Sequence, residues 1–236
     1  MCPSRMRSST SVTSVAILVA SLAAWSCGSD NSTGPGGSNG HTPPPTFSVV
    51  LDSGIVDSVA APAGEPIPVR VRVAQSGTPT AGATVTWTVQ AGHGVTSSPT
   101  SLTDINGIAS VLWTLGDSIG LNTLAAVSGD GSISMHAVGT AGPASGVIRV
   151  SADSVSVVAG GTVSIVARAV DAKGNPVSGA TLTFQAAAGS LSVTTTTTGT
   201  SGNGETAFIT PTTPGAYTVT ATLPGQASVF FHITAL

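Results

Sequence analysis

The sequence predicts an all-β protein that contains two tandem β-sandwiches. A phrase that alternates apolar and polar residues after a turn occurs twice, as Gly77–Trp87 and Asp171–Phe184, and period-2 alternation is typical of half-buried strands. Charged residues make up 7% of the chain, against about a quarter in ordinary soluble proteins. Val and Thr, which favour strands, are abundant. No apolar stripe with helical period follows residue 27.

Two predicted repeats account for most of the 236 residues. We place the first at 47–140 and the second at 141–236, with a Gly/Pro/Ser break at Gly139–Gly146. The two repeats align by hand at an offset close to 96 residues, and the insertions and deletions fall at turns, where sheets tolerate them. Each repeat carries about seven short strands with regular turn signals, which is the pattern of a sandwich.

The alignment also predicts the core. Trp87 and Phe184 occupy equivalent positions and are the expected large core residues, and Val111 and Phe208 are the expected equivalent inward pair. Two turns carry residues that tolerate positive φ or that fix φ near −65°. These turn residues are Gly77, Pro79, Gly174, Asn175 and Pro176.

The N-terminus predicts export. Residues 1–26 combine the cations Arg5 and Arg7 with an apolar run, Val12–Ala24, of the length of a signal-peptide core. The run is short for a bilayer of about 30 Å, although an uncleaved membrane anchor is an alternative reading. Without Arg5 and Arg7 the chain keeps 5 basic and 10 acidic side chains. This balance argues against nucleic acid as a partner.

The leader ends in Leu22–Cys27, which resembles the lipobox of bacterial lipoproteins. The resemblance implies cleavage before Cys27, a diacylglyceryl group on its sulfur and acylation of the new N-terminus, so that the membrane is a partner through this lipid anchor. Gly28 in the next position is compatible with delivery to the outer membrane. An ordinary signal peptide followed by a stray thiol is the alternative. Residues 27–46 are rich in Gly, Ser, Asn and Pro and predict a disordered tether.

The repeats resemble bacterial immunoglobulin-like (Ig-like) domains of the invasin and intimin kind. Asp171–Phe184, Thr103–Ala109 and Gly215–Ala221 carry the resemblance. The first repeat departs from the family phrase with Gln75 for Asp and Thr78 for Asn; we align Ser201 and Thr206 of the second repeat with the Asp and Ala of the middle phrase. The resemblance implies an Ig-like sandwich in an extracytoplasmic, often cell-surface setting, with no catalytic residue.

We find no catalytic motif and no cofactor or metal motif in the sequence. The single acids at turns are expected to cap those turns, and a calcium site near Asp130 and Asp153 is a minor alternative. His136 and His232 fall on equivalent strands and are expected to be solvated. The run Thr194–Thr198 predicts a polar edge strand, with O-glycosylation as a sharper alternative.

We therefore expect an exported, lipid-anchored envelope protein that acts as a surface spacer, adhesion or protein-interaction module and not as an enzyme. Its partner would be an extracellular protein or a glycan. A carbohydrate- or matrix-binding accessory protein is the alternative, and a hydrolase is a third reading for which the sequence shows no constellation of residues. Glycan sites need exposed aromatic side chains, and the sequence leaves Trp113, Tyr217 and Phe230 as candidates.

Overall fold

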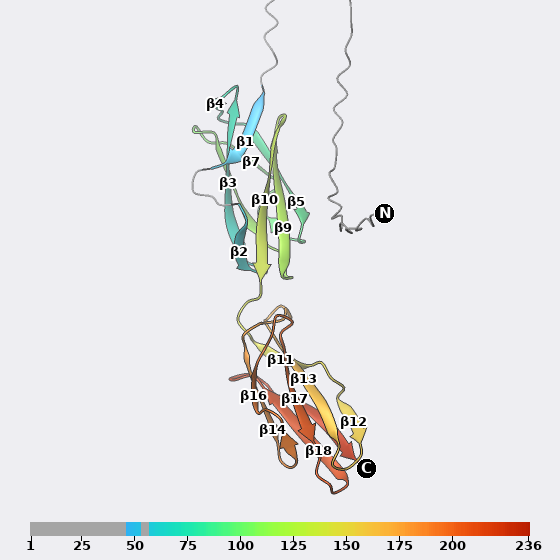
Figure 1. The fold of residues 1–236 in the computed structure, drawn as a ribbon. Helices are drawn as coiled ribbons and strands as arrows, with labels where there is room; N and C mark the ends of the chain where they lie inside the picture. The colour runs from blue at the N-terminus through green and yellow to red at the C-terminus, as the bar shows by residue number, and fades with distance from the viewer. Residues whose placement is uncertain (1–45, 53–56) are drawn as a thin grey trace, which may run out of the picture. The chain divides into compact units, whose positions relative to one another are not determined.

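A computed structural model describes residues 46–52 and 57–236, which lie in one compact unit. Within these ranges all regular elements are strands (Figure 1), and none is a helix long and apolar enough to cross a membrane. The predicted signal peptide, Cys27 and all of the predicted tether but Thr46 lie outside the described residues. The strands form four sheets, and the predicted fold of two tandem sandwiches is confirmed.

The first sandwich consists of two sheets. One has the strand order β1-β3-β8-β6, and β4 also pairs with β3; the other has the order β2-β10-β9-β5-β7. All neighbours are antiparallel except β2 and β10. The bounds are β1 Phe47–Leu51, β2 Val59–Pro62, β3 Pro66–Gln75, β4 Thr78–Pro79, β5 Thr84–Ala91, β6 Val95–Thr96, β7 Thr100–Leu102, β8 Ile108–Thr114, β9 Gly120–Ser128 and β10 Gly131–Thr140.

The second sandwich repeats this topology. One sheet has the order β11-β13-β17-β15 and the other β12-β19-β18-β14-β16, again with one parallel pair, β12 and β19. The bounds are β11 Gly146–Arg149, β12 Ser154–Val157, β13 Thr162–Val170, β14 Thr181–Ala186, β15 Ser190–Leu191, β16 Thr195–Thr197, β17 Asn203–Ile209, β18 Gly215–Thr222 and β19 Val229–Ala235.

Strand β3 shows how alternation builds the sheet. Val69, Val71 and Val73 are buried, while Arg70 and Arg72 point outward and both pair with Asp52, at 3.1 and 3.2 Å. Side chains of opposite chemistry thus separate onto opposite faces of one strand because successive Cβ atoms alternate.

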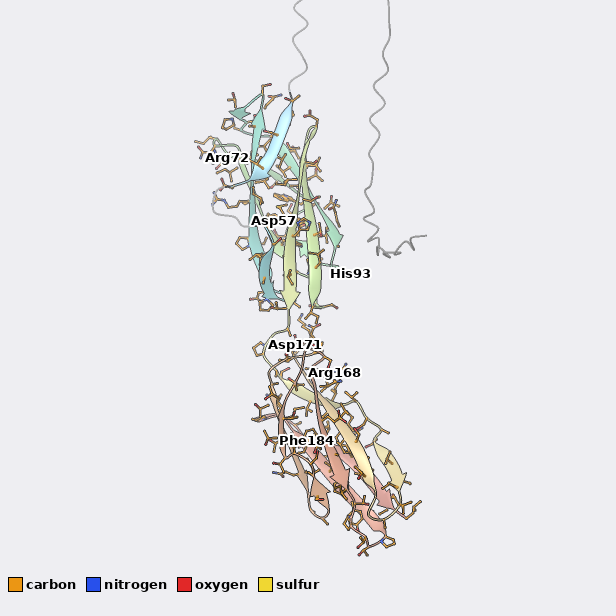
Figure 2. The ribbon with its side chains drawn as sticks, viewed as in Figure 1. Asp57, Arg72, His93, Arg168, Asp171 and Phe184 are labelled. Atoms are coloured by element: carbon orange, nitrogen blue, oxygen red, sulfur yellow. The ribbon has the colours of Figure 1, made fainter. Side chains whose placement is uncertain are left out.

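The buried side chains form two separate clusters, one in each sandwich. Trp87 and Val111 belong to the first cluster, and Phe184 and Phe208 to the second; Figure 2 labels Phe184 inside the second sandwich. Three large side chains of the first core have counterparts of different size in the second. The counterparts are Trp87 and Phe184, Trp113 and Phe208, and Met135 and Phe231.

The strand pairing corrects the predicted equivalence of Val111 and Phe208. Ile67 of β3 pairs with Trp113, and its counterpart Val163 of β13 pairs with Phe208. Trp113 is therefore the counterpart of Phe208, and the hand alignment of this strand was shifted by two residues. A shift of two keeps every side chain on its predicted face, because the period of a strand is two.

The same shift corrects the middle phrase of the family. The N–H of Val73 donates to the carbonyl of Gly107, and the N–H of Ala169 donates to that of Gly202. Gly107 and Gly202 are therefore counterparts, with φ of 73° and 74°. Gly199, not Ser201, then replaces the Asp of the phrase, and Gly204, not Thr206, replaces its Ala.

We predict that Phe184→Ala costs about 3–5 kcal/mol of unfolding free energy, because it empties a fully buried site. Phe230→Ala, on β19 of the same sheet, is the control; Phe230 is half exposed, and we expect a change within about 0.5 kcal/mol. Trp87 and Trp113 fluorescence reports unfolding of the first sandwich in urea, and the free energy of unfolding measured in this way should change little for either variant. An equal loss in both sandwiches would contradict the two separate cores.

Candidate interaction site at the junction of the sandwiches

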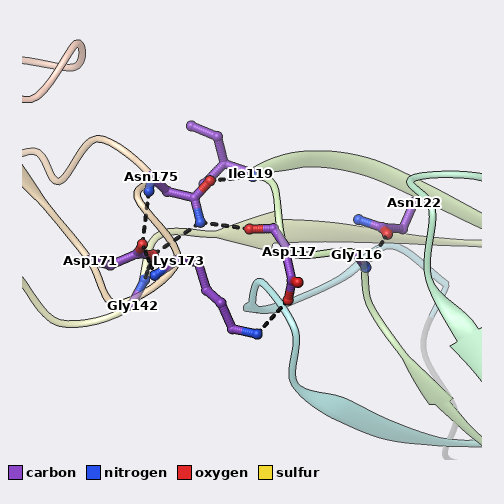
Figure 3. Close-up of polar contacts among 8 residues, drawn as sticks. All are labelled: Gly116, Asp117, Ile119, Asn122, Gly142, Asp171, Lys173 and Asn175. Carbon is purple, nitrogen blue, oxygen red and sulfur yellow. Dashed lines mark hydrogen bonds and ion pairs between the residues drawn. The ribbon is translucent and has the colours of Figure 1, made fainter.

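Polar groups from both sandwiches meet around the turn Asp171–Pro176, which connects β13 to β14 (Figure 3). The turn is built locally. Gly174 has φ of 84°, a conformation that glycine adopts without steric cost. Pro176 forms an isolated bridge with Val170. The carboxylate of Asp171 accepts the N–H of Lys173 at 2.9 Å and that of Asn175 at 2.8 Å, as an Asx turn does.

The second carboxylate oxygen of Asp171 holds the connecting segment. It accepts the backbone N–H of Gly142 at 2.9 Å and the Asn175 side-chain amide at 3.1 Å. Asp171 is 5% exposed. Burial opposes its ionisation, but the N–H donors of Gly142, Asn175 and Lys173 outweigh burial and lower the pKa of the carboxyl below its ordinary value.

Asn175 carries the contact between the sandwiches. Its Nδ2 donates to the backbone carbonyl of Asp117 at 2.8 Å, and its Oδ1 accepts the backbone N–H of Ile119 at 3.2 Å. A carboxamide has two N–H donors and an acceptor oxygen, and Nδ2 donates its second N–H to the carboxylate of Asp171. The buried Asn175 side chain thus has partners for both of its polar atoms.

Lys173 adds an ion pair with Asp117 across the same junction. Both side chains are largely exposed, at 45% and 69%, so solvent screens the pair and its contribution to stability is small. The pair lies directly beside Gly64 of the first sandwich, where an added Cβ would lie 2.8 Å from the Asp117 carboxylate and 3.0 Å from Lys173 Nζ.

The loop between β8 and β9 is held in place from inside the first sandwich. The buried Asn122 accepts the N–H of Gly116 at 3.0 Å and donates to the carbonyl of Gly120 at 3.2 Å. These two bonds fix the loop that contains Asp117 and Ile119, and therefore the carbonyl and the N–H that Asn175 contacts.

A shallow groove of about 480 Å³ lies beside this cluster. Its lining has no titratable side chain, so it offers shape and backbone polarity but no acid, base or cation for chemistry. The lining residues are Ile119, Gly120, Gly139, Thr140, Ala141, Pro176, Val177 and Ser178. In 46–52 and 57–236 no group of three His, Cys, Asp or Glu side chains is placed to hold a metal ion.

The structure places the other predicted site residues inside the sandwiches or at turns. Trp87, Val111, Phe184 and Phe208 are buried. Gly77 and Gly174 have positive φ, and Pro79 lies in the short strand β4. Trp113 is 1% exposed and so is not a surface aromatic, contrary to the expectation for a glycan site. Trp113 is a core residue of the first sandwich, at the position that Phe208 occupies in the second.

The sequence analysis did not predict a His–Asp contact that occurs once in each sandwich. His136 Nδ1 lies 3.3 Å from the Asp57 carboxylate, and His232 Nδ1 lies 3.2 Å from that of Asp153. In each pair the Asp and the His are 79 residues apart in the sequence, and the second pair follows the first at an offset of 96 residues. The backbone N–H of His136, before all other causes, lowers the pKa of Asp57. A search for acids at constant separation from the two histidines could have found both pairs.

Residues 147–234 match the family model of the bacterial Ig-like domain, group 1. The second sandwich is a bacterial Ig-like domain. The resemblance in Asp171–Phe184 and Gly215–Ala221 is thereby confirmed, and the junction turn lies within the phrase Asp171–Phe184. A search of curated proteins found no match.

Several solved structures are similar to the chain. The Escherichia coli adhesin FdeC aligns at 18% identity over 82% of this chain and 65% of its own, with a TM-score of 0.54; at this identity the likeness shows the fold. The D0–D1 domains of intimin align at 23% identity over 81% and 97%, with a TM-score of 0.32. Invasin, an integrin-binding protein, aligns at 26% identity over 81% and 40%, with a TM-score of 0.38.

We predict that Asp171 makes folding depend on pH. Because its pKa is lowered in the folded state, its stabilisation is present above the unfolded-state pKa of about 3.9 and is lost as pH falls through the folded-state value. Asp171→Asn should cost about 1.5–3 kcal/mol at neutral pH. Urea unfolding of the variant between about pH 6 and about pH 3 should show a shallower loss of stability than the original protein. Parallel profiles would contradict this role.

Proposed function

We propose that the protein is a cell-envelope lipoprotein whose two sandwiches act as a non-catalytic spacer and adhesion module. The observation that supports this most is the combination of a predicted lipobox cysteine with tandem Ig-like sandwiches joined through a polar contact. A sandwich pair of this kind supplies length and surface without a reaction centre. Similar sandwiches occur in intimin, invasin and FdeC.

The described surface supports a geometric role. It carries few charges, and those of the junction, of Asp52 and of the two histidine pairs are engaged with one another. Contact with a partner would then be made by exposed loops and sheet edges, where main-chain groups and small side chains are available. The lipid on Cys27 holds the sandwiches at the membrane, and the Gly/Ser/Pro tether gives them clearance from it.

Binding of carbohydrate or matrix is less well supported. Of the Phe and Trp side chains that the structure describes, Phe230 alone is exposed, at 49%. Tyr217 is half-buried, and its hydroxyl donates to the carbonyl of Thr213 at 2.7 Å. One exposed aromatic ring gives no coplanar platform on which a sugar chain could stack, so no described feature favours this function over adhesion.

We predict that Cys27→Ala releases the full-length protein from the membrane fraction into soluble fractions, because the thiol that would carry the lipid is removed. Cys2→Ala, within the predicted leader, is the matched control and should stay with the membrane. Fractionation of expressing cells, with immunoblotting of the sandwiches, measures both. Unchanged membrane retention of Cys27→Ala would refute lipid anchoring. Incorporation of a labelled fatty acid into the control and not into Cys27→Ala would support it.

A further inference from the structure

We propose that the turn Asp171–Pro176 and the loop Gly116–Ile119 are a matched docking pair for adjacent Ig-like sandwiches, and that neither outer end of the tandem can form it. We call these segments the docking turn and the docking loop. Their juxtaposition is the contact in which one Asn175 side chain bonds to both the Asp117 carbonyl and the Ile119 N–H. The partner that the docking loop fits is a sandwich whose turn carries this Asp and Asn.

The first sandwich has a turn at the same place, but its residues differ. The pairing of Ala74 with Pro79 corresponds to that of Val170 with Pro176, so Gln75 stands where Asp171 does and Thr78 where Asn175 does. The Thr78 side chain has one hydroxyl and cannot place a donor and an acceptor as far apart as a carboxamide does. The first sandwich therefore lacks the docking turn.

The second sandwich lacks the docking loop. The N–H of Gly64 donates to the carbonyl of Gly116, and the N–H of Gly160 donates to that of Pro211; Gly116 and Pro211 are therefore counterparts. Three residues further on, Pro214 is the counterpart of Ile119. Proline has no N–H, so it cannot supply the bond that Ile119 gives to Asn175.

The remaining residues of this loop also differ between the two sandwiches. Thr212 stands in place of Asp117 and cannot form the ion pair with a lysine. The loop of the second sandwich is fixed by Tyr217, whose hydroxyl bonds to the carbonyl of Thr213, whereas Asn122 fixes the docking loop. Tyr217 and Asn122 are counterparts in their sheets, since their partners Ile233 and Ala137 are 96 residues apart.

The docking pair adds specificity that the connecting segment alone does not supply. Ala141–Ser145 is a short run of small residues and one proline, and contacts between domains ordinarily permit relative motion. A buried polar group is costly unless it is fully paired. Asp171 and Asn175 have all their partners only when Gly142, Asp117 and Ile119 are in place, so displacement of one sandwich would break these hydrogen bonds.

The test replaces residues of the pair by those that the protein itself uses at its outer ends. Asn175→Thr installs the first sandwich's residue in the docking turn, and Ile119→Pro installs the second sandwich's residue in the docking loop. Both backbones already accommodate these residues at the counterpart positions. Pro143→Gly loosens the connecting segment and leaves the pair intact. Nitrogen-15 relaxation of the whole chain gives a rotational correlation time for each sandwich.

We expect the two sandwiches of the original protein and of Pro143→Gly to share one correlation time. In Asn175→Thr and in Ile119→Pro the correlation time of each sandwich should shift down toward that of a sandwich tumbling independently. Amide spectra of the strands report that each sandwich is still folded. A common correlation time that persists in both pair variants would overturn the proposal. So would independent tumbling in Pro143→Gly, because the connecting segment would then set the arrangement.

Discussion

The junction depends on one buried carboxylate. Asp171 accepts hydrogen bonds from three backbone N–H groups and from the Asn175 amide. Those bonds make three pieces of chain converge: the turn itself, the segment that enters the second sandwich at Gly142, and, through Asn175, the loop of the first sandwich. Removing the carboxylate would leave N–H groups without partners in a place from which water is largely excluded, which is more costly than the loss of an exposed bond.

The two cores show that the sandwich tolerates different fillings. The first uses two tryptophans and a methionine where the second uses three phenylalanines. Exchange of large residues is tolerated when the total volume and the pattern are kept. The exchange has a polar cost in the first sandwich: the indole N–H of Trp113 is buried, and no described residue pairs with it. Its counterpart Phe208 has no such group to satisfy.

Alternation and turn chemistry were enough to predict the fold, the position of the buried face and the turn at Gly174–Pro176. They could not align Trp113 with its counterpart Phe208, because a two-residue shift between the repeats leaves the alternating pattern unchanged. The junction was also beyond the sequence. Asp171 could be predicted to cap its own turn, but its bond to Gly142 and the bonds of Asn175 to Asp117 and Ile119 join residues 29 to 58 positions apart. Local patterns carry no information on such distant partners.

Hydrogen exchange at the Ile119 amide tests the central claim most directly, since the acceptor of this N–H belongs to the other sandwich. The account predicts that in the whole protein Ile119 exchanges much more slowly than the amide of its neighbour Ser118, and that its protection disappears in Asn175→Thr while the strands stay protected. Exchange of Ile119 as fast as that of Ser118 in the original protein would contradict a docked junction.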